Sequence, residues 1–166
     1  MPNTRYQISN FNCKMNIMKK LLFALLPILF TISLNAQEDP GKALKKAARA
    51  LSSFNLDQTA NEAKLTEAVD YIEIAFAAES MHGNLKMWQT RGEIFNALAQ
   101  KDVKNMVADQ EYKPKNPDAG IKASASFKKA LELAQKKYEK KDAHTGIFET
   151  GRHLNVIGNY KIQVAE

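Results

Sequence analysis

Cysteine is nearly missing from this chain, since Cys13 is the only one among its 166 residues. Cys13 lies in residues 1–36, which we expect to be separate from the folded domain. The rest of the chain contains no thiol, which excludes disulfide bonds, thiolate metal sites and cysteine nucleophiles there. This composition suits an exported protein that avoids oxidation chemistry.

Residues 1–36 have the pattern of an export signal behind a short extension. Two lysines precede an apolar run from Leu21 to Leu34, and Ala36 supplies a small residue for cleavage. The run is shorter than the roughly 20 apolar residues that span a bilayer as a helix. We therefore predict a signal segment over 18–36 in a bacterial protein exported to the periplasm or cell envelope. An uncleaved anchor is the alternative, because Leu34 is larger than the residue preferred near the cut. Only then would the protein contact a membrane.

The excess of positive charge comes largely from the same segment. The whole chain has 24 basic and 18 acidic residues and a net charge of +6. Residues 1–36 hold four basic residues and no acid, so residues 37–166 have a net charge of only +2. A nucleic-acid-binding domain needs basic residues concentrated on one face. Here the lysine pairs alternate with acids, as on solvated helix faces, so no nucleic-acid partner is expected.

The side chains that carry catalysis are also scarce. The three histidines are His82, His144 and His153, and none lies four residues from another, the spacing that places two imidazoles on one helix face for zinc. No serine stands in a G-x-S-x-G turn. We predict a protein that is not an enzyme and that carries no metal or cofactor.

Apolar residues recur at intervals of three and four over most of residues 37–166, and no segment alternates as a strand would. This pattern predicts one all-α domain with five helical segments. We expect them at about 40–53, 59–78, 85–101, 117–141 and 147–166.

The turns between these segments are predicted from local signals. Gly83 is expected to adopt the left-handed conformation that ends a helix, and Asn84 to cap the next one. A polar stretch at 102–115 is expected to form an insertion, and residues 142–146 a turn before the last helix. Because the helical pattern still runs at Glu166, a fragment or a partner that completes the stack is expected.

Two groups of residues have the spacing of a known repeat. Trp88, Gly92 and Phe95 stand at W-x2-R-G-x2-F, and Ala123, Phe127 and Ala130 stand at A-x3-F-x2-A. The chain thereby resembles tetratricopeptide-repeat proteins, whose helical hairpins stack into an α-solenoid. Arg91 departs from the leucine of the pattern, and the long gap between the two groups indicates the insertion at 102–115. A nonrepetitive helical bundle that uses the same residues as core is the alternative.

The resemblance implies a non-enzymatic scaffold that binds a protein or peptide. It places the polar face of each repeat's first helix on a concave wall, which here holds Lys86, Gln89, Glu93 and Asn96. It also implies that Gly92, Ala123 and Ala130 let two helices approach, with Trp88, Phe95 and Phe127 filling the space beside them. The competing function is a compact bundle that holds a small ligand or cofactor.

Overall fold

Five α-helices make up most of the folded part of the chain. The computed structural model describes residues 38–109 and 111–165, and the predicted signal segment lies outside them. The elements are α2 (Pro40–Leu56), α3 (Glu62–Ala77), the short 3-10 helix η2 (Glu79–Met81), α4 (Leu85–Ala108), α5 (Ala119–Leu133) and α6 (Lys137–Ala165). The prediction of an all-α fold is confirmed.

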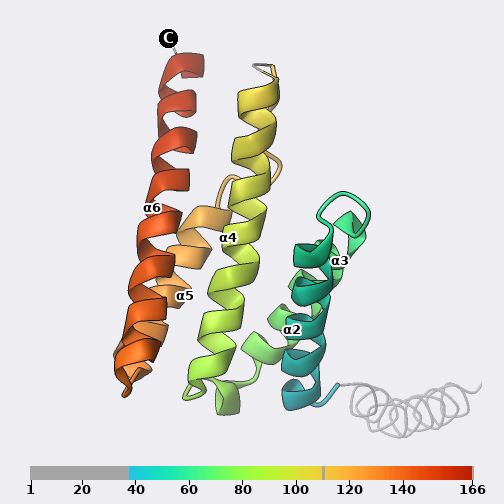
Figure 1. The fold of residues 1–166 in the computed structure, drawn as a ribbon, viewed down its shortest axis with the longest axis vertical. Helices are drawn as coiled ribbons and strands as arrows, with labels where there is room; N and C mark the ends of the chain where they lie inside the picture. The colour runs from blue at the N-terminus through green and yellow to red at the C-terminus, as the bar shows by residue number, and fades with distance from the viewer. Residues whose placement is uncertain (1–37, 110, 166) are drawn as a thin grey trace, which may run out of the picture. The chain divides into compact units, whose positions relative to one another are not determined.

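The helices pack as adjacent antiparallel pairs. Helices that are consecutive in the chain are also neighbours in space, since α2 packs on α3, α4 on α5 and α5 on α6. Helices α2, α4 and α6 run in the same direction and form one layer, with α3 and α5 returning behind them (Figure 1). Helix α4 contacts both α2 and α6, so it lies at the centre of its layer.

Local capping explains where several of these helices begin. Asp39 accepts a hydrogen bond from the backbone N–H of Lys42 at 2.7 Å, and Pro40 occupies the first position of α2. Asn84 accepts from the N–H of Met87 at 3.1 Å, which confirms the cap predicted for α4. The prediction for Gly83 is wrong, because no described glycine has a positive φ. The chain turns there through η2 instead.

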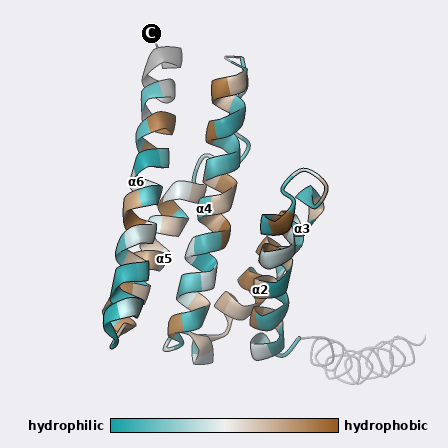
Figure 2. Cartoon of the chain, in the orientation of Figure 1, coloured by the Kyte–Doolittle hydropathy of each residue, from teal (hydrophilic) through white to brown (hydrophobic). Residues whose placement is uncertain are grey.

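The core is built largely from small side chains, which lets helix backbones approach closely. Alanines with no exposed surface lie in each of the five helices, among them Ala47, Ala68, Ala99, Ala123 and Ala143. Figure 2 shows hydrophobic and hydrophilic residues mixed along α2, α4 and the coloured part of α6. These three helices therefore have polar residues left over for solvent or for a partner.

The Phe127 side chain of α5 packs against α4 and α6. Its ring rises from α5 and is only 5% exposed. A Cβ atom built on Gly92 of α4 would lie 2.8 Å from the ring, and one on Gly146 of α6 would lie 2.5 Å from it. Ordinary carbon contacts are about 3.5–4.0 Å. The close approach predicted at Gly92 and Phe127 is therefore present, and Gly146 supplies a matching face on α6.

The predicted turn at 142–146 is wrong, because α6 is continuous from Lys137 through this segment. The chain reverses earlier, after α5 ends at Leu133. There the Glu139 carboxylate accepts hydrogen bonds from the backbone N–H groups of Gln135 and Lys136, at 3.0 and 2.9 Å. Gly146 thus reflects close packing and not a turn.

The segment predicted as an insertion, 102–115, is divided between helix and loop. Helix α4 continues to Ala108, and Asp102 lies within it, only 1% exposed. Its carboxylate accepts hydrogen bonds from the Tyr112 hydroxyl at 2.7 Å and from the N–H groups of Lys115 and Asn116 at 3.2 and 2.7 Å. The loop after α4 is therefore anchored to the helix by one buried acid.

The residues of the repeat signature are buried, with one exception. Trp88 is half-buried at the junction of α3 and α4, outside the α4–α5 interface where the resemblance placed it. Its indole N–H donates to the His82 carbonyl at 2.8 Å, and its ring meets Phe76 edge-on at 5.4 Å. The fully or nearly buried members are Gly92, Phe95, Ala123, Phe127 and Ala130.

Candidate partner-binding groove

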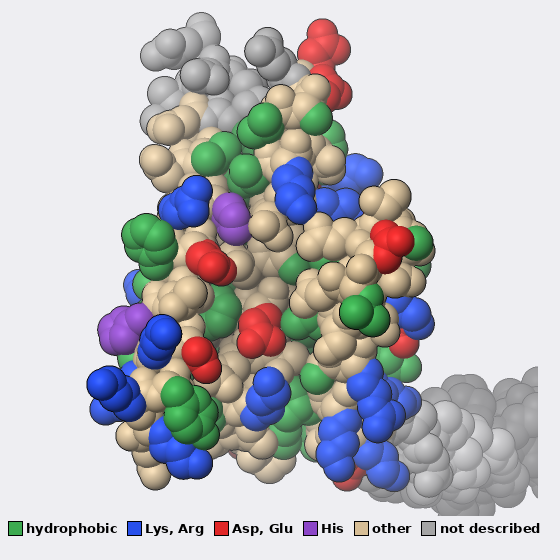
Figure 3. Space-filling view, in the orientation of Figure 1, with side chains coloured by type: hydrophobic (Ala, Val, Ile, Leu, Met, Phe, Trp, Pro, Cys, Tyr) green, Lys and Arg blue, Asp and Glu red, His purple; other side chains and the backbone are tan. Residues whose placement is uncertain are grey.

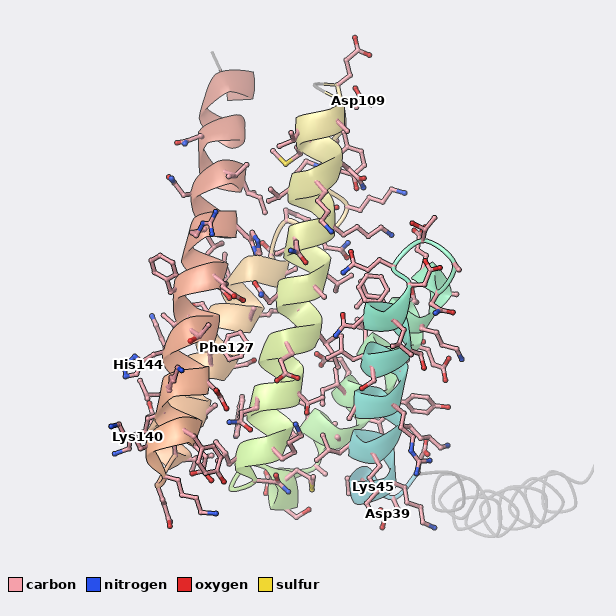
Figure 4. The ribbon with its side chains drawn as sticks, viewed as in Figure 1. Asp39, Lys45, Asp109, Phe127, Lys140 and His144 are labelled. Carbon is pink, nitrogen blue, oxygen red and sulfur yellow. The ribbon has the colours of Figure 1, made fainter. Side chains whose placement is uncertain are left out.

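A hollow of about 550 Å³ lies between the helices of the front layer. Helices α4 and α6 form its walls, α2 contributes to one side, and Phe127 of α5 reaches it from the rear layer. Figure 4 places Phe127 between α4 and α6. The lining residues are Leu51, Asn55, Glu93, Asn96, Ala97, Gln100, Phe127, Lys141, Asp142, Thr145, Gly146 and Glu149.

The structure brings two of the four predicted partner-binding residues into this hollow. Glu93 and Asn96 line it from α4. Lys86 and Gln89 precede them on the same face of the helix, Lys86 exposed and Gln89 half-buried, but they do not line the hollow. Two of the four predicted residues therefore lie on one side of the hollow, and the other two lie on α4 beyond its edge. We call this hollow, together with its continuation along α4 and α6, the groove.

Acidic residues outnumber basic residues in the lining of the hollow. Glu93 comes from α4, and Asp142 and Glu149 come from α6. Figure 3 shows acidic side chains gathered in the hollow between α4 and α6, with basic side chains around them. Lys141 is the only basic residue in the lining, so the hollow has an excess of negative charge.

The environment of Glu93 disfavours its charged form. Burial of the carboxyl group in the groove raises its pKa, the positive charge of Lys86 opposes this shift, and the negative charge of Asp142 adds to it. The side chain as a whole still reaches solvent.

Asn96 is held in place by two side chains of α6. The His153 ring Nδ1 lies 3.0 Å from the Asn96 Oδ1, and the Thr150 hydroxyl lies 3.2 Å from the same oxygen. The hydroxyl is nearer to the Gly146 carbonyl, at 2.7 Å. Burial lowers the pKa of His153 and Arg152 adds to the shift, while Glu149 opposes it. This favours a neutral ring that donates from Nδ1 to the amide oxygen.

A second hollow of about 430 Å³ continues the groove toward the far ends of α4 and α6. Gln100 lines both hollows, so they adjoin. The second has no carboxylate in its lining and carries Lys104 and Arg152 instead. Its lining residues are Gln100, Val103, Lys104, Arg152, His153, Asn155 and Val156. The charge along the groove therefore changes sign.

The histidines do not converge on one site. His82 lies at the α3–α4 turn, where its Nε2 is 2.9 Å from the Phe76 carbonyl, and His144 lies on the outer side of α6 (Figure 4). Within residues 38–109 and 111–165, no three His, Cys, Asp or Glu side chains are placed to hold a metal ion.

Arg91 is a structural residue whose burial was not predicted. It is only 7% exposed and donates to the Ser126 hydroxyl at 2.9 Å and to the Glu73 carboxylate at 3.2 Å. Its guanidinium also lies 4.0 Å from the Phe76 ring centre and 4.9 Å from that of Phe95. Arg91 thereby joins α3, α4 and α5, where the repeat pattern has a leucine. Glu73 and Phe76, three positions apart on one helix face, were the available sequence signal.

Comparison with known proteins gives no match: no protein-family model, no curated protein and no solved structure is similar to the chain. In the part of the chain that the structure describes, none of the helices is both apolar and long enough to span a membrane.

Proposed function

We propose that the protein is a non-enzymatic scaffold of tetratricopeptide-like repeats that holds an extended polypeptide in the groove between α2, α4 and α6. The observation that carries this proposal is the groove itself, whose walls come from parallel helices of one layer. Stacked helical pairs rotate slightly from one to the next, which creates an extended concave surface suited to binding. The signal pattern at 18–36 supports a place for the scaffold in the cell envelope.

The chemistry of the lining suits a peptide backbone. Asn55, Asn96 and Gln100 carry carboxamides, which can donate to peptide carbonyls and accept from peptide N–H groups. Leu51 and Phe127 add apolar surface on which a side chain can rest. Polar contacts to the backbone with a few apolar anchors are what peptide-binding grooves use.

The packing around the groove supports the repeat assignment. Gly92 and Phe127 hold α4 and α5 together, as the resemblance implies, and Gly146 repeats the arrangement on α6. A groove held by such close packing is preorganised, which lowers the entropy lost on binding.

A substitution that fills the groove tests this function. Gln100 is exposed and lines both hollows, so Gln100→Trp should block them without disturbing the core. Gln135→Trp is the matched control, because Gln135 is also exposed but lies in the α5–α6 turn. Peptides selected from a random display library on the full chain should lose binding at least about tenfold to Gln100→Trp and keep it with the control. Selected peptides that bind both variants equally would reject the groove.

A further inference from the structure

We infer that the groove selects an extended peptide with a basic side chain in the first hollow and an acidic side chain about five residues away, in the second. This inference rests on the proposed function and adds the chemistry of the partner. The structural basis is the change of charge along one continuous groove.

The acids of the first hollow lack ion-pair partners among the residues that the structure describes. Glu93, Asp142 and Glu149 form no ion pair there, whereas Glu38, Glu62, Glu67, Glu73 and Glu132 each pair with a basic residue. The negative charge of Asp142 adds to the raised pKa of Glu93, so these two carboxylates repel each other. A guanidinium or ammonium group would relieve that repulsion and gain charge-assisted hydrogen bonds.

A peptide side chain fits this hollow better than a metal ion does. The structure places no group of three His, Cys, Asp or Glu residues close enough to hold a metal in the described part of the chain. Carboxylates spread around a hollow suit a larger cation, and arginine offers five N–H donors in a planar fork. Asn96, held by Thr150 and His153, presents a fixed amide beside it.

The second hollow supplies the opposite charge. Lys104 and Arg152 line it, and its lining contains no acid. Lys104 donates to the neutral amide of Gln58 at 2.8 Å, which leaves its charge uncompensated. An acidic side chain of the guest would pair with these two cations.

The helix geometry sets the distance from Glu93 and Asp142 to the two basic residues of the second hollow. Helices α4 and α6 run in parallel (Figure 1), and Glu93 and Asp142 precede Lys104 and Arg152 by 11 and 10 positions respectively. Glu149 lies between these two ends, three positions before Arg152. At about 1.5 Å per helical residue, the two ends lie about 15–17 Å apart along the groove. An extended peptide covers that length in about five residues at about 3.3 Å each. Either direction of the peptide satisfies this spacing.

Labelled designed peptides test the selection. The first probe is fluorescein-Gly-Ser-Arg-Ala-Leu-Ala-Ser-Glu-Ser-Gly, in which arginine and glutamate are five positions apart, and the second exchanges these two residues. Two further probes replace arginine by uncharged citrulline, and two more place the charges only two positions apart. Binding to the full chain is measured by fluorescence anisotropy at low salt.

At least one of the two full-spacing probes should bind, and its citrulline and short-spacing counterparts should bind at least about tenfold more weakly. Glu93→Gln, Asp142→Asn and Glu149→Gln combined should lose this preference. The matched control combines Asp70→Asn, Glu79→Gln and Glu111→Gln, which makes the same charge change at exposed acids outside the groove, and should keep the preference.

The inference is overturned if neither full-spacing probe binds up to about 1 mM, if citrulline makes no difference, or if both triple variants weaken binding equally. Its failure is distinct from that of the proposed function. Display-selected peptides that lack charges but are blocked by Gln100→Trp would leave the groove standing and remove only the charge selection. Peptides indifferent to Gln100→Trp would remove the groove itself.

Discussion

Two glycines of α6 should respond to alanine in opposite directions. A Cβ atom at Gly146 would lie 2.5–2.6 Å from three ring carbons of Phe127, whereas a Cβ atom at Gly151 would have no heavy atom within 4 Å. Both positions lie inside the same helix. Helix propensity alone would therefore favour alanine equally at the two positions, and any difference reports the packing against Phe127.

The magnitudes follow from two opposing effects. Alanine in place of glycine inside a helix stabilises by about 1 kcal/mol. Overpacking costs about 1–3 kcal/mol, and the upper end applies at Gly146 because the ring is rigid and the same three ring carbons also lie against Gly92. We expect Gly146→Ala to lower the free energy of unfolding by about 2 kcal/mol and Gly151→Ala to raise it by about 1 kcal/mol.

Urea denaturation followed by circular dichroism measures both values. Phe127→Leu combined with Gly146→Ala should recover part of the loss relative to the sum of the single changes, because the smaller side chain leaves room for the new methyl group. The packing described for Phe127 would be refuted by a Gly146→Ala variant as stable as Gly151→Ala. An additive double variant would equally show that the ring and the glycine do not interact.

Three further changes test other features. Asp102→Ala should destabilise the protein by about 3 kcal/mol and expose the loop after α4 to proteolysis, because three donors lose their acceptor; an unchanged cleavage rate would contradict this. Arg91→Ala should lower the free energy of unfolding by about 3 kcal/mol, because it leaves a cavity. Arg91→Met should stay within about 1 kcal/mol of the parent, because Glu73 remains partly exposed and the Ser126 hydroxyl still donates to the Lys122 carbonyl. Equal losses of stability for the two variants in urea denaturation would contradict this prediction. The pKa of Glu93 is raised in the folded state, so its contribution to stability is complete below pH 4.5 and is lost as the pH rises through the folded-state pKa. The free energy of unfolding of the parent should therefore fall relative to that of Glu93→Gln as the pH rises through this range. Parallel curves of stability against pH would exclude a raised pKa at Glu93.

The sequence was sufficient for the features that depend on neighbouring residues. Three-and-four periodicity predicted the all-α class and five helical segments, and the Asn84 cap follows from a side chain that reaches a backbone N–H three residues away. The repeat motif around Trp88 and Gly92 predicted the close approach of α4 and α5 at Gly92. The repeat resemblance placed Glu93 and Asn96 on the predicted wall, and their spacing is consistent with one helix face.

The features that were missed depend on residues far apart in the chain. Gly146 looked like a turn because its packing partner, Phe127, belongs to another helix. Asp142 and Glu149 of α6 line the groove because α6 lies beside α4, which the sequence alone does not show. Arg91 and Asp102 are buried because their hydrogen-bond partners lie on other elements. Local pattern therefore determined which segments are helical and which face is polar. Tertiary packing alone decided which polar groups are buried and which charges share the groove, because each depends on the distance between helices.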